Sequence, residues 1–367
     1  MKKYILTILP LLFLNTVFSQ VLYNETFDNY ILGNLSNDVS GQIPGQGGWL
    51  THNYLKTGTS APNAHSITAY PNRGKVLTLS VPPLLDGDFY VRKTNLDVFI
   101  DNRSFGNNVI KFEIDFYTGP RHYIGSAGAQ IALRSDNLPP FANKYDYKHL
   151  LSWHYGYNTI NDGQTSCLVA DGAGAFYRYS LDIHDPNDPY TTLPFKTWIR
   201  LIVYLDYTNK KAYIETPYLG TVIAVGFLHN STSTNLMEDH KVTSLTMHTA
   251  TDSVSSGYNV MHRYDNIKIT ALNAVPPEVI ALSVNTVLAE KFNLYPNPAT
   301  DIVNITNSEN HLVNQVVIYD ITGKQLSTQT FNNESEIQLN VSHLASGVYM
   351  LHIETDAGVA VKKMVKK

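Results

Sequence analysis

The amino-acid sequence predicts an all-β protein that folds as a larger and a smaller β-sandwich. Short runs in which apolar and polar residues alternate, the pattern of half-buried strands, recur along most of the 367 residues. Tyrosine occurs 24 times, and aromatic and β-branched residues favour strands. Residues 274–290 contain neither aromatic residues nor glycine and divide the strand-rich sequence in two. No long stretch has the apolar spacing of a helix.

The first 19 residues have the pattern of a secretory signal peptide. A basic start, Met1–Lys3, precedes the apolar run Tyr4–Phe18, and Val17 and Ser19 supply small residues before a cut. We expect cleavage before Gln20. The apolar run is too short for a retained membrane span.

Residues 20–272 predict a jelly roll, because ten or more strands in one domain pack best as two sheets. In Lys111–Tyr117, alternation directs Phe112, Ile114 and Phe116 to one face and Glu113, Asp115 and Tyr117 to the other. The expected strands are Lys75–Val81, Phe89–Lys93, Val109–Tyr117, Ala129–Arg134, Phe176–Asp182, Trp198–Tyr207, Lys211–Thr216, Thr221–Phe227, Val242–Thr249 and His262–Thr270.

Residues 273–290 predict an extended linker, with the proline pair Pro276-Pro277 near its start. Residues 291–367 then predict about seven short strands, which suffice for a small immunoglobulin-like sandwich. Tyr295–Pro298 is a turn, because its two prolines fix φ and remove backbone donors. Strand patterns follow over residues 302–306, 315–321, 337–341, 347–354 and 359–364.

Four short blocks of this terminal region resemble the type A C-terminal sorting domain of the type 9 secretion system of Bacteroidetes. The blocks are a YPNP start, a YDxxGK turn, an SGxY strand and a basic end. The residues that carry them are Tyr295, Pro296, Asn297, Pro298, Tyr319, Asp320, Gly323, Lys324, Ser346, Gly347, Tyr349, Lys362, Lys363, Lys366 and Lys367.

The resemblance implies an export signal that docks on an outer-membrane shuttle barrel after passage through a large translocon barrel. It implies a secreted or cell-surface protein whose tail is cleaved or exchanged for a lipopolysaccharide anchor. The basic end suits an acidic receptor pocket. An ordinary terminal module with the same core and turn residues is the plainer interpretation.

A second resemblance covers the first domain. Asn24–Tyr30, Gly45–Trp49, Thr197–Lys211 and Tyr264–Thr270 are similar to segments of concanavalin-like, laminin G or lectin-type jelly rolls of secreted Bacteroidetes proteins. The resemblance implies that the first and last strands lie side by side. A ligand does not follow from the fold.

Composition excludes some functions. The net charge of −4 gives no basic field for nucleic acid. Cys167 is the one cysteine, so no intramolecular disulfide forms, and we expect it to pack as a small buried apolar residue.

One predicted strand, within residues 109–117, has a sequence that resembles a catalytic strand of an enzyme family. Glu113-Ile-Asp115-Phe-Tyr117 is similar to the catalytic strand of family 16 glycoside hydrolases, in which Glu113 would be the nucleophile and Asp115 its helper. Such enzymes need a second catalytic carboxyl group roughly 5–5.5 Å from the first. Tyr117 or Thr118 stands at that position, so we expect this chemistry to be absent. A lyase with a Tyr/His pair stays open, but no spacing singles out the pair.

A glycan site needs aromatic faces together with polar groups. The densest candidates are Tyr145, Tyr147, Trp153, His154, Tyr155 and Tyr157. Core aromatic residues are the plainer interpretation, and Trp198 is expected in the core. We expect a surface glycan-binding or adhesion module, with gliding motility as a possible setting. A polysaccharide-degrading hydrolase or lyase and a structural surface component are the alternatives.

A structural calcium ion is the one cofactor that the sequence suggests. Its expected ligands are Glu25, Asp28 and Asp265, which would join the terminal strands. The acidic loop Asp182–Pro189 is more simply a polar turn. The 13 histidines lack the paired spacing of a zinc site.

Overall fold

The computed structural model describes residues 18–57, 61, 63–81, 86–120, 127–135, 149–157, 164–181, 193–219, 221–251, 260–284, 289, 291–308, 310–320, 325–355 and 358–367. The predicted signal peptide, apart from its last two residues, lies outside these ranges. In the described part, no helix is sufficiently long and apolar to cross a membrane.

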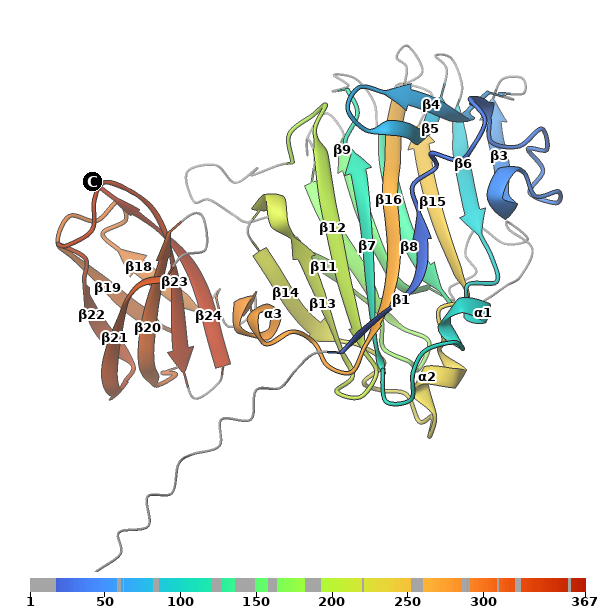
Figure 1. Ribbon diagram of the computed structural model, residues 1–367. Coiled ribbons are helices and arrows are strands. Elements are labelled where there is room, and N and C mark those ends of the chain that lie inside the picture. The colour runs from blue at the N-terminus through green and yellow to red at the C-terminus, as the bar shows by residue number, and fades with distance from the viewer. Residues whose placement is uncertain are drawn as a thin grey trace, which may run out of the picture.

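The first domain is a jelly roll of two sheets, as the strand patterns predict (Figure 1). The sheets are antiparallel apart from one short parallel pair at an edge of the larger sheet. Sheet A has the order β17-β14-β13-β12-β7-β16-β5-β4-β2, and β1 also pairs with β16. Its strands are β1 (Ser19–Glu25), β2 (Gly33–Asn34), β4 (His65–Tyr70), β5 (Gly74–Val81), β7 (Val109–Tyr117), β12 (Trp198–Asp206), β13 (Lys211–Thr216), β14 (Thr221–Gly226), β16 (Val260–Leu272) and β17 (Ser283–Val284).

Sheet B has the order β11-β10-β9-β8-β15-β6-β3. Its strands are β3 (Trp49–Thr57), β6 (Asp86–Lys93), β8 (Ala127–Arg134), β9 (His149–Tyr157), β10 (Gln164–Ala170), β11 (Phe176–Ser180) and β15 (Ser244–Thr251). Short helical turns lie outside the sheets: η1 (Gln46–Gly48), α1 (Asp97–Ile100), η2 (Pro217–Leu219) and α2 (Leu236–Asp239).

The core lies between the two sheets. Phe112, Ile114 and Phe116 of β7 are all buried, which confirms the predicted alternation. The ring of Phe116 lies 5.2 Å from that of Trp153 and 5.5 Å from that of Tyr155, both on sheet B. Cys167 is buried in the same core, and burial raises the pKa of its thiol to about 12.

The first and last strands of the jelly roll lie side by side, as the resemblance implies (Figure 1). β1 pairs antiparallel with β16, from Ser19 opposite Leu272 to Glu25 opposite Ile267. The other edge of β16 pairs with β7 along most of its length. The terminal strand is therefore central to sheet A.

The segment predicted as an extended linker contains a helix, α3 (Pro277–Leu282), followed by β17, which pairs with β14. Pro277 stands at the start of the helix, where its missing N–H costs nothing. Val275 and Val279 are buried against a patch on the outer face of sheet A. The patch contains Val109, Ile202, Tyr204, Tyr213, Val222 and Leu272. The prediction of an extended segment is therefore wrong for residues 277–282, because it overlooked this apolar patch.

The terminal region folds as a sandwich of seven strands in its described residues, which confirms the prediction. One sheet has the order β18-β19-β22 and the other β21-β20-β23-β24. Phe292, Ile305, Ile318, Leu339 and Leu351 are in its core. The strands are β18 (Phe292–Tyr295), β19 (Ile302–Asn307), β20 (Val313–Asp320), β21 (Gln325–Glu334), β22 (Glu336–Asn340), β23 (Gly347–Thr355) and β24 (Gly358–Lys366).

Truncating Val279 tests whether α3 belongs to the jelly roll. Val279→Ala removes two buried methyl groups, so we expect a loss of about 1–2 kcal/mol in unfolding free energy. Ile280, its neighbour, is 49% exposed, and Ile280→Ala should change stability by less than about 0.5 kcal/mol. Urea unfolding followed by tryptophan fluorescence measures both. Equal effects would contradict the packing of α3.

Candidate functional site

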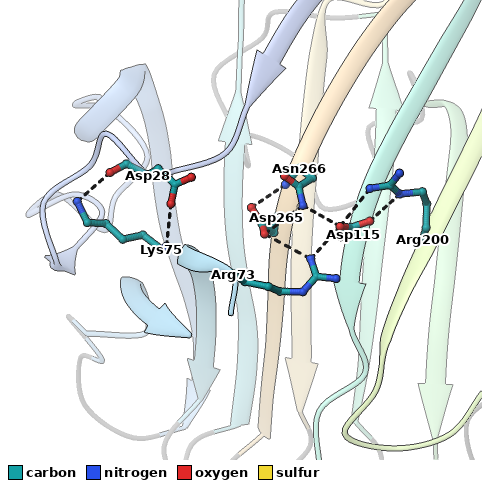
Figure 2. A network of polar contacts seen from close by, with 7 residues as sticks. All are labelled: Asp28, Arg73, Lys75, Asp115, Arg200, Asp265 and Asn266. Carbon is teal, nitrogen blue, oxygen red and sulfur yellow. Dashed lines mark hydrogen bonds and ion pairs between the residues drawn. The ribbon is translucent and has the colours of Figure 1, made fainter. Parts of the chain in front are cut away.

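The catalytic-looking strand β7 carries a network of charged residues on the outer face of sheet A (Figure 2). Asp115 accepts hydrogen bonds from Arg200 Nε, Arg73 Nη1 and Asn266 Nδ2, each at 2.8 Å. Burial opposes ionisation, but these hydrogen bonds hold the pKa of Asp115 below its usual value. Asp115 therefore links β7 to β12, β16 and the turn that precedes β5.

Asp265 lies beside Asp115 in the same network and behaves in the opposite way. Its side chain is only 3% exposed, and burial raises the pKa of Asp265 to about 6. The neighbouring Asp115 carboxylate adds to the rise, whereas the Asn266 backbone N–H and Arg73 oppose it. The pair consists of one firmly ionised carboxylate and one that takes up a proton more readily.

The remaining positions of the glycosidase-like strand are engaged in other contacts. Glu113 forms a 2.9 Å ion pair with Lys111. Tyr117 packs against Tyr70 and Trp198, with ring centroids 5.8 and 5.5 Å away. The hydroxyl of Thr118 donates to the carbonyl oxygen of Pro194 at 2.8 Å. Glu113, Tyr117 and Thr118 thus all make contacts that stabilise sheet A.

Trp198 is not in the main core, contrary to expectation. It lies opposite Tyr117 on the outer face of sheet A, and the Arg73 guanidinium is 4.2 Å from its ring centroid. Alternation along β12 gives the reason, because Ile199 and Leu201 take the inward positions.

The structure does not assemble the predicted calcium ligands. Glu25 accepts hydrogen bonds from the Phe27 N–H and the Tyr30 hydroxyl. Figure 2 shows Asp28 turned toward Lys75, apart from Asp265. Within the described residues, no group of three or more His, Cys, Asp or Glu side chains is arranged to hold a metal ion. The loop 182–189 lies outside the described residues.

The predicted aromatic glycan site needs correction. Trp153 and Tyr155 are each 1% exposed and pack in the core, so they offer no face to a ligand. Alternation along β9 places His154 between them on the opposite, outer face. Tyr145, Tyr147 and the side chain of Tyr157 lie outside the described part of the structure.

His154 belongs to a row of polar side chains that crosses the outer face of sheet B. The antiparallel registers place six residues opposite one another across six neighbouring strands: His52, Tyr90, His248, Gln130, His154 and Ser166. We call this set the polar row. The spacing within each strand gives no sign of it in the sequence, because each strand contributes one member.

The members of the polar row contact one another. The rings of Tyr90 and His248 stack with centroids 4.2 Å apart and planes 8° apart. His248 Nε2 lies 3.1 Å from Asp88 Oδ1. His154 Nε2 lies 2.9 Å from Ser152 Oγ and 3.4 Å from Gln130 Nε2. The row therefore presents oriented groups that both donate and accept hydrogen bonds.

His154 is uncharged at neutral pH. Burial lowers the pKa of His154 to about 4, and the positive charge of Arg178 and nearby His248 add to this. One ring nitrogen of a neutral imidazole accepts hydrogen bonds or a proton. His154 is thus suited to hydrogen bonding with a hydroxyl group, and also to general-base chemistry.

A strip of very small residues runs beside the polar row. Gly128 and Gly156 are directly opposite each other on β8 and β9, and Ala250 lies opposite Gly128 on β15. Neither glycine has a left-handed φ. A Cβ added at Gly156 would meet no described atom within 4 Å. Neither backbone geometry nor described packing therefore explains glycine at position 156.

At the chain's C-terminal end, the YPNP turn holds the last strand. Asn297 Oδ1 accepts from the Val365 N–H at 2.8 Å, and Asn297 Nδ2 donates to the Lys363 carbonyl oxygen at 3.1 Å. Ala299 pairs with the same strand through the Val365 carbonyl oxygen. The YPNP turn and the basic end of the chain, which are the first and last of the four sequence blocks, are therefore held together by hydrogen bonds.

The other predicted sorting residues fall into structural and accessible groups. Tyr349 is largely buried and its hydroxyl donates to the Ala345 carbonyl oxygen, just before Gly347. Asp320 ends β20, and Gly323 and Lys324 lie outside the described residues. Exposed or half-buried are Tyr295, Pro296, Pro298, Lys362, Lys363, Lys366 and Lys367.

Comparison with protein families decides the nature of this end. A family described as "Secretion system C-terminal sorting domain" matches residues 293–367. Residues 293–367 are a sorting domain of the type 9 secretion system. This sorting domain directs export of the chain to the cell surface or the extracellular space.

Solved structures are similar to the chain at low sequence identity. A family 16 endo-glucanase from Bacteroides ovatus is 10% identical with a TM-score of 0.39, over 63% of this chain and 98% of that chain. A family 7 alginate lyase is 13% identical with a TM-score of 0.34, over 58% and 84%. A sialidase is 12% identical with a TM-score of 0.35, over 64% and 18%, so the match spans less than a fifth of its length. No curated protein matches the chain.

Replacing Asp265 by asparagine tests the charged network. Because the native pKa of about 6 exceeds that of the unfolded chain, ionised Asp265 destabilises the fold as pH rises from 4 to 6. Asp265→Asn abolishes this effect, so its unfolding free energy relative to the unmodified protein should rise by about 1–3 kcal/mol between pH 4 and pH 7.

Denaturant unfolding at both pH values measures this difference. Asp301→Asn, at an exposed position of the sorting domain, is the control and should follow the unmodified protein. If Asp265→Asn also follows it, Asp265 is not held in a destabilising ionised state.

Proposed function

We propose that the jelly roll is a glycan-binding module that acts in adhesion at the cell surface. The ligand would lie across the outer face of sheet B along the polar row. The observation that carries the proposal is the position of this row beside the Gly128–Gly156 pair. The sorting domain places the module where extracellular glycans are available.

The polar row suits sugars because of its chemistry. Sugar hydroxyl groups both donate and accept hydrogen bonds, and so do the amide of Gln130, the imidazole of His154 and the hydroxyl of Ser166. The stacked pair of Tyr90 and His248 adds a rigid aromatic element. At about 4.8 Å between strands, the row spans roughly 24 Å, which favours an extended ligand.

Gly156 supports close approach of this ligand, whereas a Cβ at Gly128 would lie 3.1 Å from the Tyr155 carbonyl oxygen. Glycine inside a strand weakens it and often marks a place where a ligand approaches the backbone. At Gly156 the described residues leave room for a side chain, yet none is present. A sugar ring lying over β8 and β9 would use that room and reach Gln130 and His154.

A polysaccharide-cleaving enzyme is the second candidate. The neutral imidazole of His154, which lies within 3.4 Å of the Gln130 amide, favours it. In a lyase, such a base would take the proton from the sugar carbon next to a carboxylate. A C=C double bond would then form as the glycosidic C–O bond breaks, and the leaving oxygen would take a proton from water. Release of unsaturated sugar products by the full chain, lost in His154→Ala, would establish this candidate. Binding without product would favour the adhesion module.

For the sorting domain, we propose that its last strand and the YPNP turn contact the outer-membrane shuttle and translocon barrels. Tyr295 of the YPNP turn is 52% exposed. Asn297 of the same turn is hydrogen-bonded to Lys363 of β24, so the turn and the lysine-containing strand lie together. The lysine-rich strand end suits an acidic receptor surface. Cleavage of the tail or its exchange for a lipopolysaccharide anchor would follow this contact.

Filling the space above Gly156 tests glycan binding. Gly156→Leu should weaken binding at least about tenfold, or about 1.4 kcal/mol, because its side chain would take the place of the ligand. The melting temperature should stay or rise, because glycine is unfavourable inside strands. Gly156→Ala should have a small effect. A glycan array, followed by titration of its best ligand with the full chain, provides the measurement.

The control places the same side chain elsewhere. Lys211→Leu adds leucine at an exposed position of sheet A and should leave binding unchanged. If no array glycan binds the unmodified protein, or if Gly156→Leu binds as tightly, the outer face of sheet B is not the glycan site.

Removing the Asn297 amide tests how the last strand is presented. Asn297→Ala removes both hydrogen bonds to β24, so amide exchange at residues 363–367 should accelerate and the exported fraction should fall. Asn293→Ala, at an exposed position of β18, is the control. Hydrogen exchange of the purified chain and immunoblots of cell and medium fractions measure the two effects. Unchanged export despite faster exchange would refute a role for the ordered strand in sorting.

A further inference from the structure

The charges on sheet B are distributed unevenly, which bears on the kind of glycan. The neighbouring strands β8, β9, β10 and β11 contain no aspartate or glutamate, although the chain has 31 of them. The same strands contain Arg134 and Arg178. The carboxylates of the described sheet, Asp86 and Asp88, both lie on β6. Arg92 and Lys93 also lie on β6, on the same strand as these two aspartates. The β8–β11 end, which contains Gln130, His154 and Ser166, therefore differs in carrying positive charge without a carboxylate.

Arg178 is available at this end of the polar row. It is exposed, and register places it opposite Leu168, two residues from Ser166 on β10. Its Nη1 donates to the Ser166 hydroxyl at 3.3 Å. A guanidinium has five N–H donors in a planar fork, which fits the two oxygens of a carboxylate or sulfate group. One weak contact to a hydroxyl leaves most of this capacity for a ligand.

Arg134 extends the positive charge along the face. Its Nη1 lies 2.7 Å from His149 Nε2, and its charge acts on the Tyr90 hydroxyl. The registers place Arg134 and Arg178 on the same side of Gln130 and His154, the side away from Gly128 and Gly156. His154 is neutral, so the charge of this end comes from the two arginines.

We propose that the glycan bound by sheet B is an acidic polysaccharide whose anionic groups contact Arg178 at the β8–β11 end of the polar row. This inference rests on the glycan-binding function proposed above and adds the chemical class of its ligand. The chain as a whole carries a net charge of −4, so a general attraction to polyanions does not account for such binding.

The test compares three linear polymers with the full chain: polygalacturonate, a sulfated galactan and a neutral β-glucan. Binding to at least one acidic polymer should be tighter than to the glucan and should weaken as salt is added. Arg178→Gln should lower the affinity for the acidic polymer about tenfold and reduce its salt dependence. Arg178→Lys should be intermediate, because it keeps the charge but loses the fork.

Two controls separate this inference from the function on which it rests. Lys211→Gln removes one positive charge from sheet A and should have no effect. One outcome would overturn the acidic ligand and retain the glycan site. In that outcome the unmodified protein binds the neutral glucan as tightly as the acidic polymers, Gly156→Leu loses this binding and Arg178→Gln keeps it. Acidic binding that neither variant changes would overturn both, as would failure of every polymer and array glycan to bind.

Discussion

The jelly roll depends on the pairing of β16, because this strand joins the beginning, the middle and the end of the domain. One edge of β16 pairs with β7, and the other pairs first with β5 and then with β1. A one-residue bulge between Asp265 and Lys268 interrupts the pairing with β7. Without the bulge, Tyr264 and Ile267 would point to opposite faces, whereas both are fully buried. The bulge therefore keeps both halves of β16 in register with one core.

The same bulge creates the charged network on the outer face. Asn266 adopts a left-handed φ of 49°, which asparagine tolerates better than most residues. In this conformation its side chain reaches Asp115 and its backbone N–H reaches Asp265. A carboxylate held by two arginines and an amide is committed to structure.

The two outer faces of the jelly roll thus differ in how their polar groups are satisfied. On sheet A, Asp115 pairs with Arg73 and Arg200 within the network, and α3 covers the apolar patch. On sheet B, the polar row lies next to the small residues Gly128, Gly156 and Ala250. A ligand on the outer face of sheet A would have to displace the ion pairs of Asp115.

The sequence predicts well those features that depend on neighbours in the chain. Alternation along Lys111–Tyr117 suffices to place Phe112, Ile114 and Phe116 in the core. It does not distinguish which side of β9 faces inward, because Trp153 and His154 are both compatible with either face. The helix α3 likewise has no local pattern that predicts it, because its stability comes from Val275 and Val279 on an apolar patch formed by distant strands.

The sorting domain and the polar row show why one site is visible in the sequence and the other is not. Asn297 contacts Lys363 and Val365 across the fold, but each partner lies in a short block with its own recognisable residues. The polar row takes one residue from each of six strands, between His52 and His248, and no local pattern marks any of them. Its members become a set only through register, which is fixed by the apolar residues on the opposite face of the same strands. The candidate ligand site of this protein is therefore positioned by its core, in which Trp153 and Tyr155 pack behind the polar row.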